Sequence, residues 1–287
     1  MHSRIEAHPG TVSKILWHFT GGPRWDEAKQ RQGVRRKKPS DAYKALRLIL
    51  KTKKLRLGQY HEFVKAKYHV RVTDSKTKAV AREPREALIE SAPVCCLADI
   101  PIAHLSYHAR RYGKFAIGFH RRAVVKHKFS PVFYVLNEAD PLQSLRRCFS
   151  GLGAISDGAQ YLDVDRYAED IMCEHGHPAD DSSHGLRDIG GAFESIGEDA
   201  KKAQSELRDS LAFVKTFSQS EFSTVYCERE WRSAKEFIFE LDDVAMIVLP
   251  KQGADPSFFD DFVKRKIATV PRSIPIVPWE DLVEYQD

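Results

Sequence analysis

The spacing of short apolar runs along the chain is the feature that most limits its fold. Runs bounded by Gly, Pro, Ser or Asp predict strands in two groups, at residues 15–20, 94–97, 115–119 and 132–136 and again at 236–241, 244–249 and 274–277. The two strands at 236–241 and 244–249 are expected to pair through a tight turn at 242–243. Residues 142–215, between the groups, are mostly polar and predict helices. We therefore expect an α+β protein, a single domain over 1–287 with a mostly helical insertion.

Three helices are predicted outside that insertion. One covers residues 42–53 behind a cap at Ser40 or Asp41, with apolar residues on one face. A second starts near Pro101, and a third covers residues 256–267.

Composition narrows the class of protein. Hydrophobic residues make up 42% of the 287 residues and charged residues 30%, which is typical of globular chains. No apolar run approaches the roughly 20 residues that span a bilayer, and residues 1–10 lack an apolar signal segment. The five cysteines are scattered and form neither a disulfide framework nor a zinc pattern. We expect a cytoplasmic protein with no membrane partner.

Basic residues are concentrated in two segments, although the formal net charge is only +5. Residues 24–39 are predicted to form a basic loop, and residues 60–85 are polar and basic with strand-like alternation around 68–72. Such segments can bind nucleic-acid phosphates, but a solvated surface explains the charges equally well.

Two motifs carry candidate functional residues. His18 and Thr20 end the first strand and can present an imidazole and a hydroxyl to a ligand, or His18 can be a residue at the edge of the core. Glu228 and Glu230 are two residues apart, so on a regular strand they would share one face and one pKa would be raised. The alternative is a solvated face on which Arg229 or Arg232 pairs with these carboxylates.

A third motif follows the strand at 94–97. His104 and His108 have the i, i+4 spacing of metal ligands, but no glutamate follows His104, so we expect no metal site. Tyr107 between them is either a stacking platform for a ligand or a core residue.

Together these segments resemble the AbiGi family of abortive-infection proteins. The resemblance rests on five landmarks, Leu16–Thr20, Cys96–Pro101, Tyr112–Phe119, Pro131–Val135 and Glu228–Arg232. It implies a role in phage defence, as an antitoxin-like partner of a second protein.

The order of the landmarks is also similar to that in poly(ADP-ribose) polymerases and related ADP-ribosyltransferases. That similarity implies a split mixed sheet with flanking helices, and NAD as the substrate. It implies that NAD is held by His18, Phe19, Thr20, Cys96, His104 and Tyr107. Glu230 would bond the nicotinamide ribose, with Glu228 completing a Glu-x-Glu pair. Cys96 and His104 depart from the Tyr and Ser of those enzymes.

Three functions are therefore open at this point. The first is an NAD-cleaving effector, in which Glu230 stabilises oxocarbenium character as the nicotinamide–ribose bond breaks. The second is a non-catalytic antitoxin or regulator that binds a partner toxin or a phage component. The third is a nucleic-acid binder that uses the basic segments 24–39 and 60–85.

Overall fold

The computed structural model describes residues 13–26, 28, 31–58, 62–73, 80–161, 182–221, 228–254, 256–264 and 270–283. The chain divides into two compact units, one of residues 1–61, 93–134 and 217–287 and the other of residues 62–92 and 135–216. The insertion expected at 142–215 falls within the second unit, which also contains a long hairpin before it.

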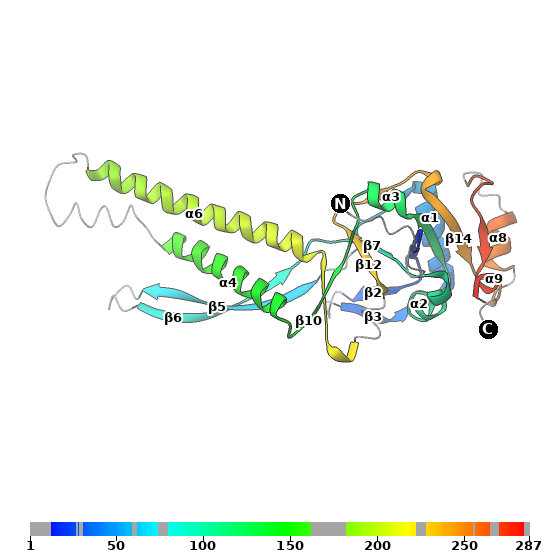
Figure 1. Cartoon of the computed structure of the whole chain (residues 1–287), viewed down its shortest axis with the longest axis horizontal. Coiled ribbons are helices and arrows are strands. Elements are labelled where there is room, and N and C mark those ends of the chain that lie inside the picture. Colours follow the sequence, from blue (N-terminus) through cyan, green and yellow to red (C-terminus); the bar gives the residue numbers. More distant parts are fainter. Residues whose placement is uncertain are drawn as a thin grey trace, which may run out of the picture. The chain divides into compact units, whose positions relative to one another are not determined.

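A seven-stranded mixed sheet forms the centre of the first unit (Figure 1). Its order is β15 (Ile276–Pro278), β14 (Val244–Leu249), β8 (Ala116–His120), β1 (Ile15–Phe19), β7 (Cys95–Ala98), β12 (Glu230–Ser233) and β9 (Ser130–Pro131). β14 and β15 run parallel, and the other neighbours run antiparallel. The prediction of an α+β protein with a mixed sheet is confirmed.

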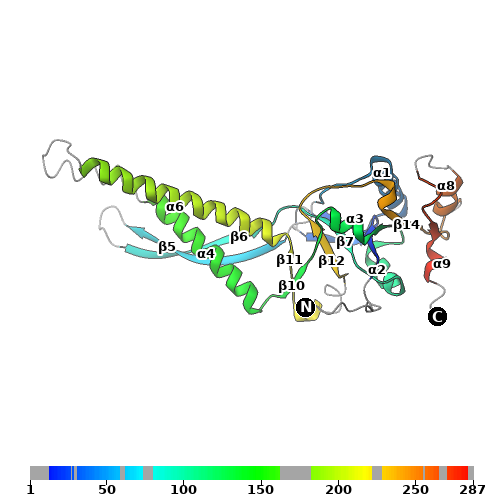
Figure 2. The same cartoon turned by 45° about the horizontal axis from the view of Figure 1, so that its top comes forward.

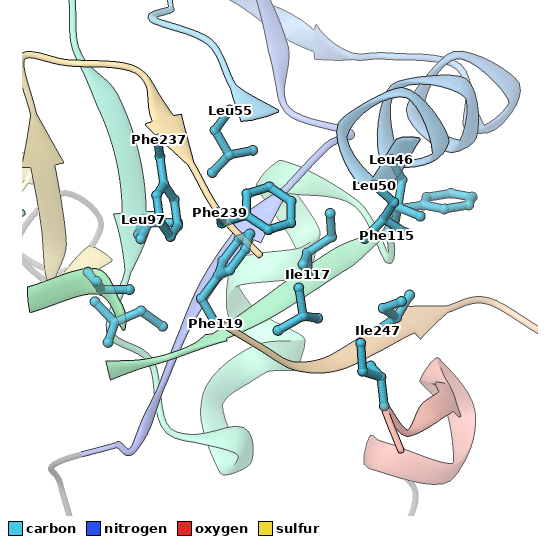
Figure 3. Close-up of a cluster of buried hydrophobic side chains, with 14 of the residues drawn as sticks. Leu46, Leu50, Leu55, Leu97, Phe115, Ile117, Phe119, Phe237, Phe239 and Ile247 are labelled. Carbon is cyan, nitrogen blue, oxygen red and sulfur yellow. The ribbon is translucent and has the colours of Figure 1, made fainter. Parts of the chain in front are cut away.

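The first face of this sheet carries the larger apolar core, and we call it the α1 face. Leu46 and Leu50 of α1 (Pro39–Thr52) pack there with Leu97, Ile117 and others (Figure 3). Part of the same core comes from α3 (Arg121–Lys126) and α8 (Phe258–Lys264). α1 begins with Pro39, a residue favoured in the first helical turn, and ends at Thr52, after which Lys53 adopts the left-handed conformation.

The opposite face, which we call the α2 face, packs against α2 (Leu105–Tyr112) and α9 (Trp279–Val283). Trp17 is its largest sheet residue, 1% exposed, and its indole N–H donates to the Ile100 carbonyl at 3.1 Å. Gly118 on the next strand makes room for this ring, since a Cβ there would lie 3.0 Å from the Trp17 Cζ3 atom. The helix predicted to start near Pro101 is present, and it begins as the short 3₁₀ helix η1 (Ile102–His104) that leads into α2.

Two predictions about the first unit were wrong. The basic loop expected at 24–39 is largely a hairpin of β2 (Pro23–Asp26) and β3 (Arg31–Arg36) followed by the start of α1. Its polar strands lack the apolar alternation from which strands are predicted, and backbone pairing defines them instead.

The second wrong prediction is the pairing of the strands at 236–241 and 244–249. β13 (Phe237–Ile238) pairs with β4 (Lys54–Leu55), whereas β14 pairs with β8 and β15. A 3₁₀ turn, η4 (Leu241–Asp243), separates them and is closed by a reciprocal capping box between Glu240 and Asp243. Burial explains the separation, because β14 fills the sheet centre while Phe237 enters the core of the α1 face.

The second unit joins a two-stranded ribbon to two long helices. β5 (Phe63–Thr73) and β6 (Val80–Glu90) form the ribbon, and α4 (Asp140–Tyr161) and α6 (Ser182–Leu211) lie side by side along it (Figures 1 and 2). Their shared core consists of Ile89, Val135, Leu142, Phe149 and Leu211.

β10 (Phe133–Leu136) and β11 (Val214–Phe217) pair where the chain passes between the units, and a 3₁₀ turn, η2 (Gln219–Glu221), follows β11. In the described part of the chain, none of the helices has an apolar stretch long enough to cross a membrane.

Candidate functional site

Three neighbouring strands, β1, β7 and β12, carry most of the residues singled out from the sequence. Trp17 lies opposite Ala98, and Ala98 lies opposite Glu230, so these three residues belong to the α2 face. His18 and Leu97 occupy the alternate positions and belong to the α1 face. The sheet therefore lies between the His18 imidazole and the Glu230 carboxylate.

Glu230 is held in a buried, two-pronged ion pair. The Arg232 Nε and Nη2 atoms each donate to one Glu230 oxygen at 3.0 Å. The Arg232 side chain is 0% exposed and that of Glu230 10% exposed. Tyr134 holds the backbone, because its hydroxyl accepts a hydrogen bond from the Glu230 N–H at 2.7 Å. Both carboxylate oxygens therefore have guanidinium donors, and the ion pair stabilises the start of β12.

The Cys96 thiol lies beside this pair and hydrogen-bonds to the Glu230 carboxylate. Burial raises the pKa of the Cys96 thiol well above its ordinary range, and the negative charge of Glu230 raises it further. Cys96 is therefore a protonated donor and not a thiolate nucleophile.

Glu228 has a different set of partners. Its Oε1 atom accepts from the Tyr112 hydroxyl at 2.8 Å and from Arg111 Nη1 at 3.1 Å, both at the end of α2. Arg229, between the two glutamates, has a φ of 43°, in the left-handed region that non-glycine residues seldom adopt. This backbone turn interrupts the strand alternation, so Glu228 bonds to α2 while Glu230 bonds within β12.

Arg229 itself takes part in a second charge cluster. Asp99, directly after β7, accepts at its Oδ2 atom from Arg121 Nη2 at 2.8 Å and from Arg229 Nη2 at 3.1 Å. The Arg121 guanidinium lies 5.2 Å from the centre of the Trp231 ring, within cation–π range. Among the residues that the structure describes, the buried Asp99 Oδ1 atom has no hydrogen-bond partner.

His18 is partly buried and bonds to the main chain. Its Nδ1 atom lies 3.3 Å from the Cys96 carbonyl oxygen, so the neutral ring donates to that carbonyl. Burial lowers the pKa of His18 from its ordinary 6.5 to about 4, and the nearby Lys37 charge adds to the effect. The imidazole is therefore neutral at pH 7.

The two neighbours of His18 in the motif also have structural partners. The buried Thr20 hydroxyl donates to the Ala42 carbonyl of α1 at 2.8 Å. Phe19 belongs to the α2 face, where its ring centre lies 4.8 Å from that of His108. The Thr20 hydroxyl therefore bonds to α1, whereas the Phe19 ring packs on the α2 face.

On α2 and the 3₁₀ turn before it, the residues expected to touch NAD are exposed. His104 and Tyr107 are both exposed, Tyr107 by 46%. His108 is the buried histidine of this helix and stacks on Tyr112 with ring centres 4.3 Å apart. No cluster of three or more potential metal ligands occurs among the described residues.

Of the eight candidate residues, the structure brings together Glu230 and Cys96, with Glu228 nearby in sequence but bonded elsewhere. Three partners of the two glutamates, Arg111, Tyr112 and Tyr134, were not predicted from the sequence. One signal was available, because Arg111 and Tyr112 follow His108 at the i+3 and i+4 spacing of a helix face. The Tyr134 contact joins residues 96 positions apart, which no local pattern indicates.

Comparison with known proteins identifies one matching family and one named relative. A family model described as "Putative abortive phage resistance protein AbiGi, antitoxin" matches residues 62–269. A protein named "Abortive phage resistance protein AbiGi", from Lactococcus lactis subsp. cremoris, is 26% identical over 161 residues, which are 54% of this chain and 55% of that protein. The match thus spans about half the length of that relative. No solved structure matches the chain.

The family match covers only part of the candidate site. Cys96, His104, Tyr107 and both glutamates lie inside the matched residues, together with the whole second unit. β1, with His18, Phe19 and Thr20, lies before them.

Proposed function

The chain belongs to the AbiGi family, as the sequence resemblance predicted, and from that premise we propose that it acts in abortive phage resistance as an antitoxin that binds a partner toxin. The observation that carries the proposal is the family match over residues 62–269, whose description includes the word antitoxin. The named relative in Lactococcus lactis supports the setting of phage defence.

The geometry of the candidate site supports a binding role over a catalytic one. Cleavage of NAD by the expected route needs a carboxylate that bonds the ribose hydroxyl and an imidazole on the same side of the substrate. Here the Glu230 oxygens each accept from Arg232, and His18 belongs to the opposite face of the sheet. The charges at this site stabilise the fold, which leaves the exposed surface to carry function.

An NAD-cleaving, ADP-ribosyltransferase-like effector is the second candidate. It is favoured by the close approach of Glu230 and Cys96, two of the residues that the resemblance assigned to NAD. In this alternative Arg232 would release the carboxylate when NAD enters, and Glu230 would stabilise the oxocarbenium-like transition state.

One pair of assays separates the two candidates. In the first, the chain is co-expressed with an inducible copy of the protein encoded beside it, and growth is recorded. In the second, purified chain is incubated with NAD and nicotinamide release is measured. An antitoxin restores growth and releases no nicotinamide.

The variant to compare is Glu230→Met/Arg232→Met, which removes both charges together and so avoids a lone buried charge. We expect it to protect as well as the natural chain. Nicotinamide release that this variant abolishes, together with absence of growth protection by the natural chain, would refute the antitoxin proposal in favour of the enzyme.

A further inference from the structure

The segment of residues 35–56, which includes all of α1, is strongly one-sided in charge. It contains ten basic residues and a single acidic one, Asp41. Each of the ten basic side chains is partly or fully exposed; they are Arg35, Arg36, Lys37, Lys38, Lys44, Arg47, Lys51, Lys53, Lys54 and Arg56. Ten basic residues less one acidic residue give this segment a formal charge of +9, whereas the whole chain has only +5. Positive charge is therefore concentrated around α1.

The outer side of α1 carries part of this charge. Leu46 and Leu50, at most 1% exposed, mark the side that is turned to the core. Lys44 and Lys51 are seven residues apart, about two helical turns, and both are exposed on the opposite side. Arg47 lies between them and is partly exposed. The three cations therefore share the outer side of the helix over about 10 Å.

The first turn of α1 gathers further cations from two elements. Lys38 directly precedes the helix and is exposed. Arg24 of β2 reaches the same turn, where its Nη2 atom donates to Asp41 Oδ2 at 3.1 Å. Burial lowers the pKa of the Lys37 ammonium, and the nearby Arg24 charge lowers it further. The acidic residue of the segment is thus already paired, and positive charge is in excess at this end of the helix.

We call Lys38, Lys44, Arg47 and Lys51 the basic surface. Among the residues that the structure describes, none of these four side chains has an acidic partner in an ion pair. Their charges do not contribute to the fold through such pairs, and they are accessible to an anionic ligand from outside.

The composition of α1 distinguishes between kinds of anionic partner. Protein interfaces are depleted in lysine and have an apolar centre, whereas Leu48 is the one large apolar side chain exposed on α1. A helix that binds a membrane surface needs an exposed apolar face, and the apolar face of α1 is buried in the core. Single-stranded nucleic acid stacks its bases on aromatic side chains, but the aromatic residue of α1, Tyr43, is buried. A double-stranded phosphate backbone fits the exposed residues best.

We propose that the basic surface binds the phosphate backbone of duplex DNA. Lysine and arginine side chains provide affinity for phosphates that is independent of sequence. From Lys38 to Lys51 the helix rises about 20 Å, which corresponds to about six base-pair steps of the duplex. The major groove of B-DNA admits an α-helix, whereas that of A-form RNA is deep and narrow, which favours DNA over duplex RNA. The inference goes beyond the antitoxin role and does not depend on it.

The test uses the full chain and a fluorescent mixed-sequence DNA duplex, with anisotropy measured between ~50 and ~200 mM salt. Contact of the four cations with phosphates predicts that the logarithm of the association constant falls with the logarithm of salt at a slope of about −3.6. Lys44→Ala/Lys51→Ala removes two contacts and should change the slope to about −1.8. Across this salt range the affinity should then fall about 150-fold for the natural chain and about 12-fold for the variant.

Two controls separate loss of contacts from loss of folding. Lys201→Ala/Lys202→Ala removes two exposed lysines from α6 of the second unit and should leave the slope unchanged. Alanine is a strong helix former, so Lys44→Ala/Lys51→Ala should unfold at the same urea concentration as the natural chain. If it does not, Lys44→Gln/Lys51→Gln, which keeps long side chains without their charges, should give the same slope of about −1.8.

Four results would overturn the proposal. The first is absence of DNA binding, or a salt slope that neither double variant at positions 44 and 51 changes. The second is equal binding of duplex RNA. The third is equal binding of phosphatidylserine vesicles, which would indicate a membrane. The fourth is competition by polyglutamate as strong as that by unlabelled DNA, which would indicate an acidic protein as the partner.

Discussion

Removing one charge of the Glu230–Arg232 pair while leaving the other should strongly destabilise the first unit. In Arg232→Met the carboxylate keeps its charge with 10% exposure but loses both donors at 3.0 Å, and in Glu230→Met the fully buried guanidinium loses its counter-ion. Breaking a buried pair in this way costs about 3–5 kcal/mol. The double variant removes both charges for apolar side chains, so its stability should return to within about 1 kcal/mol of the natural chain.

Tryptophan fluorescence during urea unfolding is a suitable assay for this cycle. All four tryptophans, at positions 17, 25, 231 and 279, belong to the first unit, so the signal reports on that unit. The two single variants should unfold at lower urea concentration with an unchanged slope, and the double variant close to the natural chain. If each single change costs under about 1 kcal/mol, or if the double change costs the sum of both, the two charges are not coupled and the reasoning fails.

Two further predictions concern β1 and its neighbour. Burial lowers the pKa of His18 from 6.5 to about 4, so as the pH falls His18 is protonated in the unfolded chain before it is protonated in the folded chain. The free energy of unfolding should therefore be highest above pH 6.5 and fall by up to about 3 kcal/mol as the pH approaches 4. The amide of His18→Asn can still donate to the Cys96 carbonyl but does not titrate, so this variant should not show the loss of stability that His18 causes between pH 6.5 and 4. Melting temperatures measured from pH 7 downward check this, and a pH profile of the variant parallel to that of the natural chain would contradict the prediction. Gly118→Ala would place a Cβ 2.7 Å from the Ile15 Cγ2 atom and should cost about 1–3 kcal/mol in urea unfolding. Gly151→Ala, in α4 with nothing within 4 Å of the added atom, should instead leave stability equal or slightly higher, and equal effects at both glycines would refute the steric explanation.

The parts of the fold that the sequence predicted are those that local patterns determine. β1, β7, β8 and α1 follow from apolar runs and helical periodicity, and their bounds agree with the expected ranges to within about three residues. The partners of strands were harder to predict, because pairing depends on residues far away in the chain. β13 pairs with β4, from which it is separated in the chain by the whole second unit, and β14 pairs with β8.

The sequence-based prediction that Glu228 and Glu230 share one face was wrong because one residue departs from the extended conformation of a strand. Two glutamates separated by one residue share a face only when the residue between them is extended. Arg229 adopts a positive φ, so Glu228 bonds to Arg111 while Glu230 bonds to Arg232. Nothing in an arginine indicates this conformation, which glycine adopts more easily. Both interpretations of the sequence pattern, a shared carboxylate pair and a solvated face paired with Arg229 or Arg232, therefore placed the two glutamates on one face.

The buried charges of the first unit contribute to its stability. In the first unit, buried charges are matched within the fold, as the pair of Glu230 with Arg232 and the two arginines on Asp99 show. Substitutions there should reduce stability first, and binding only through unfolding.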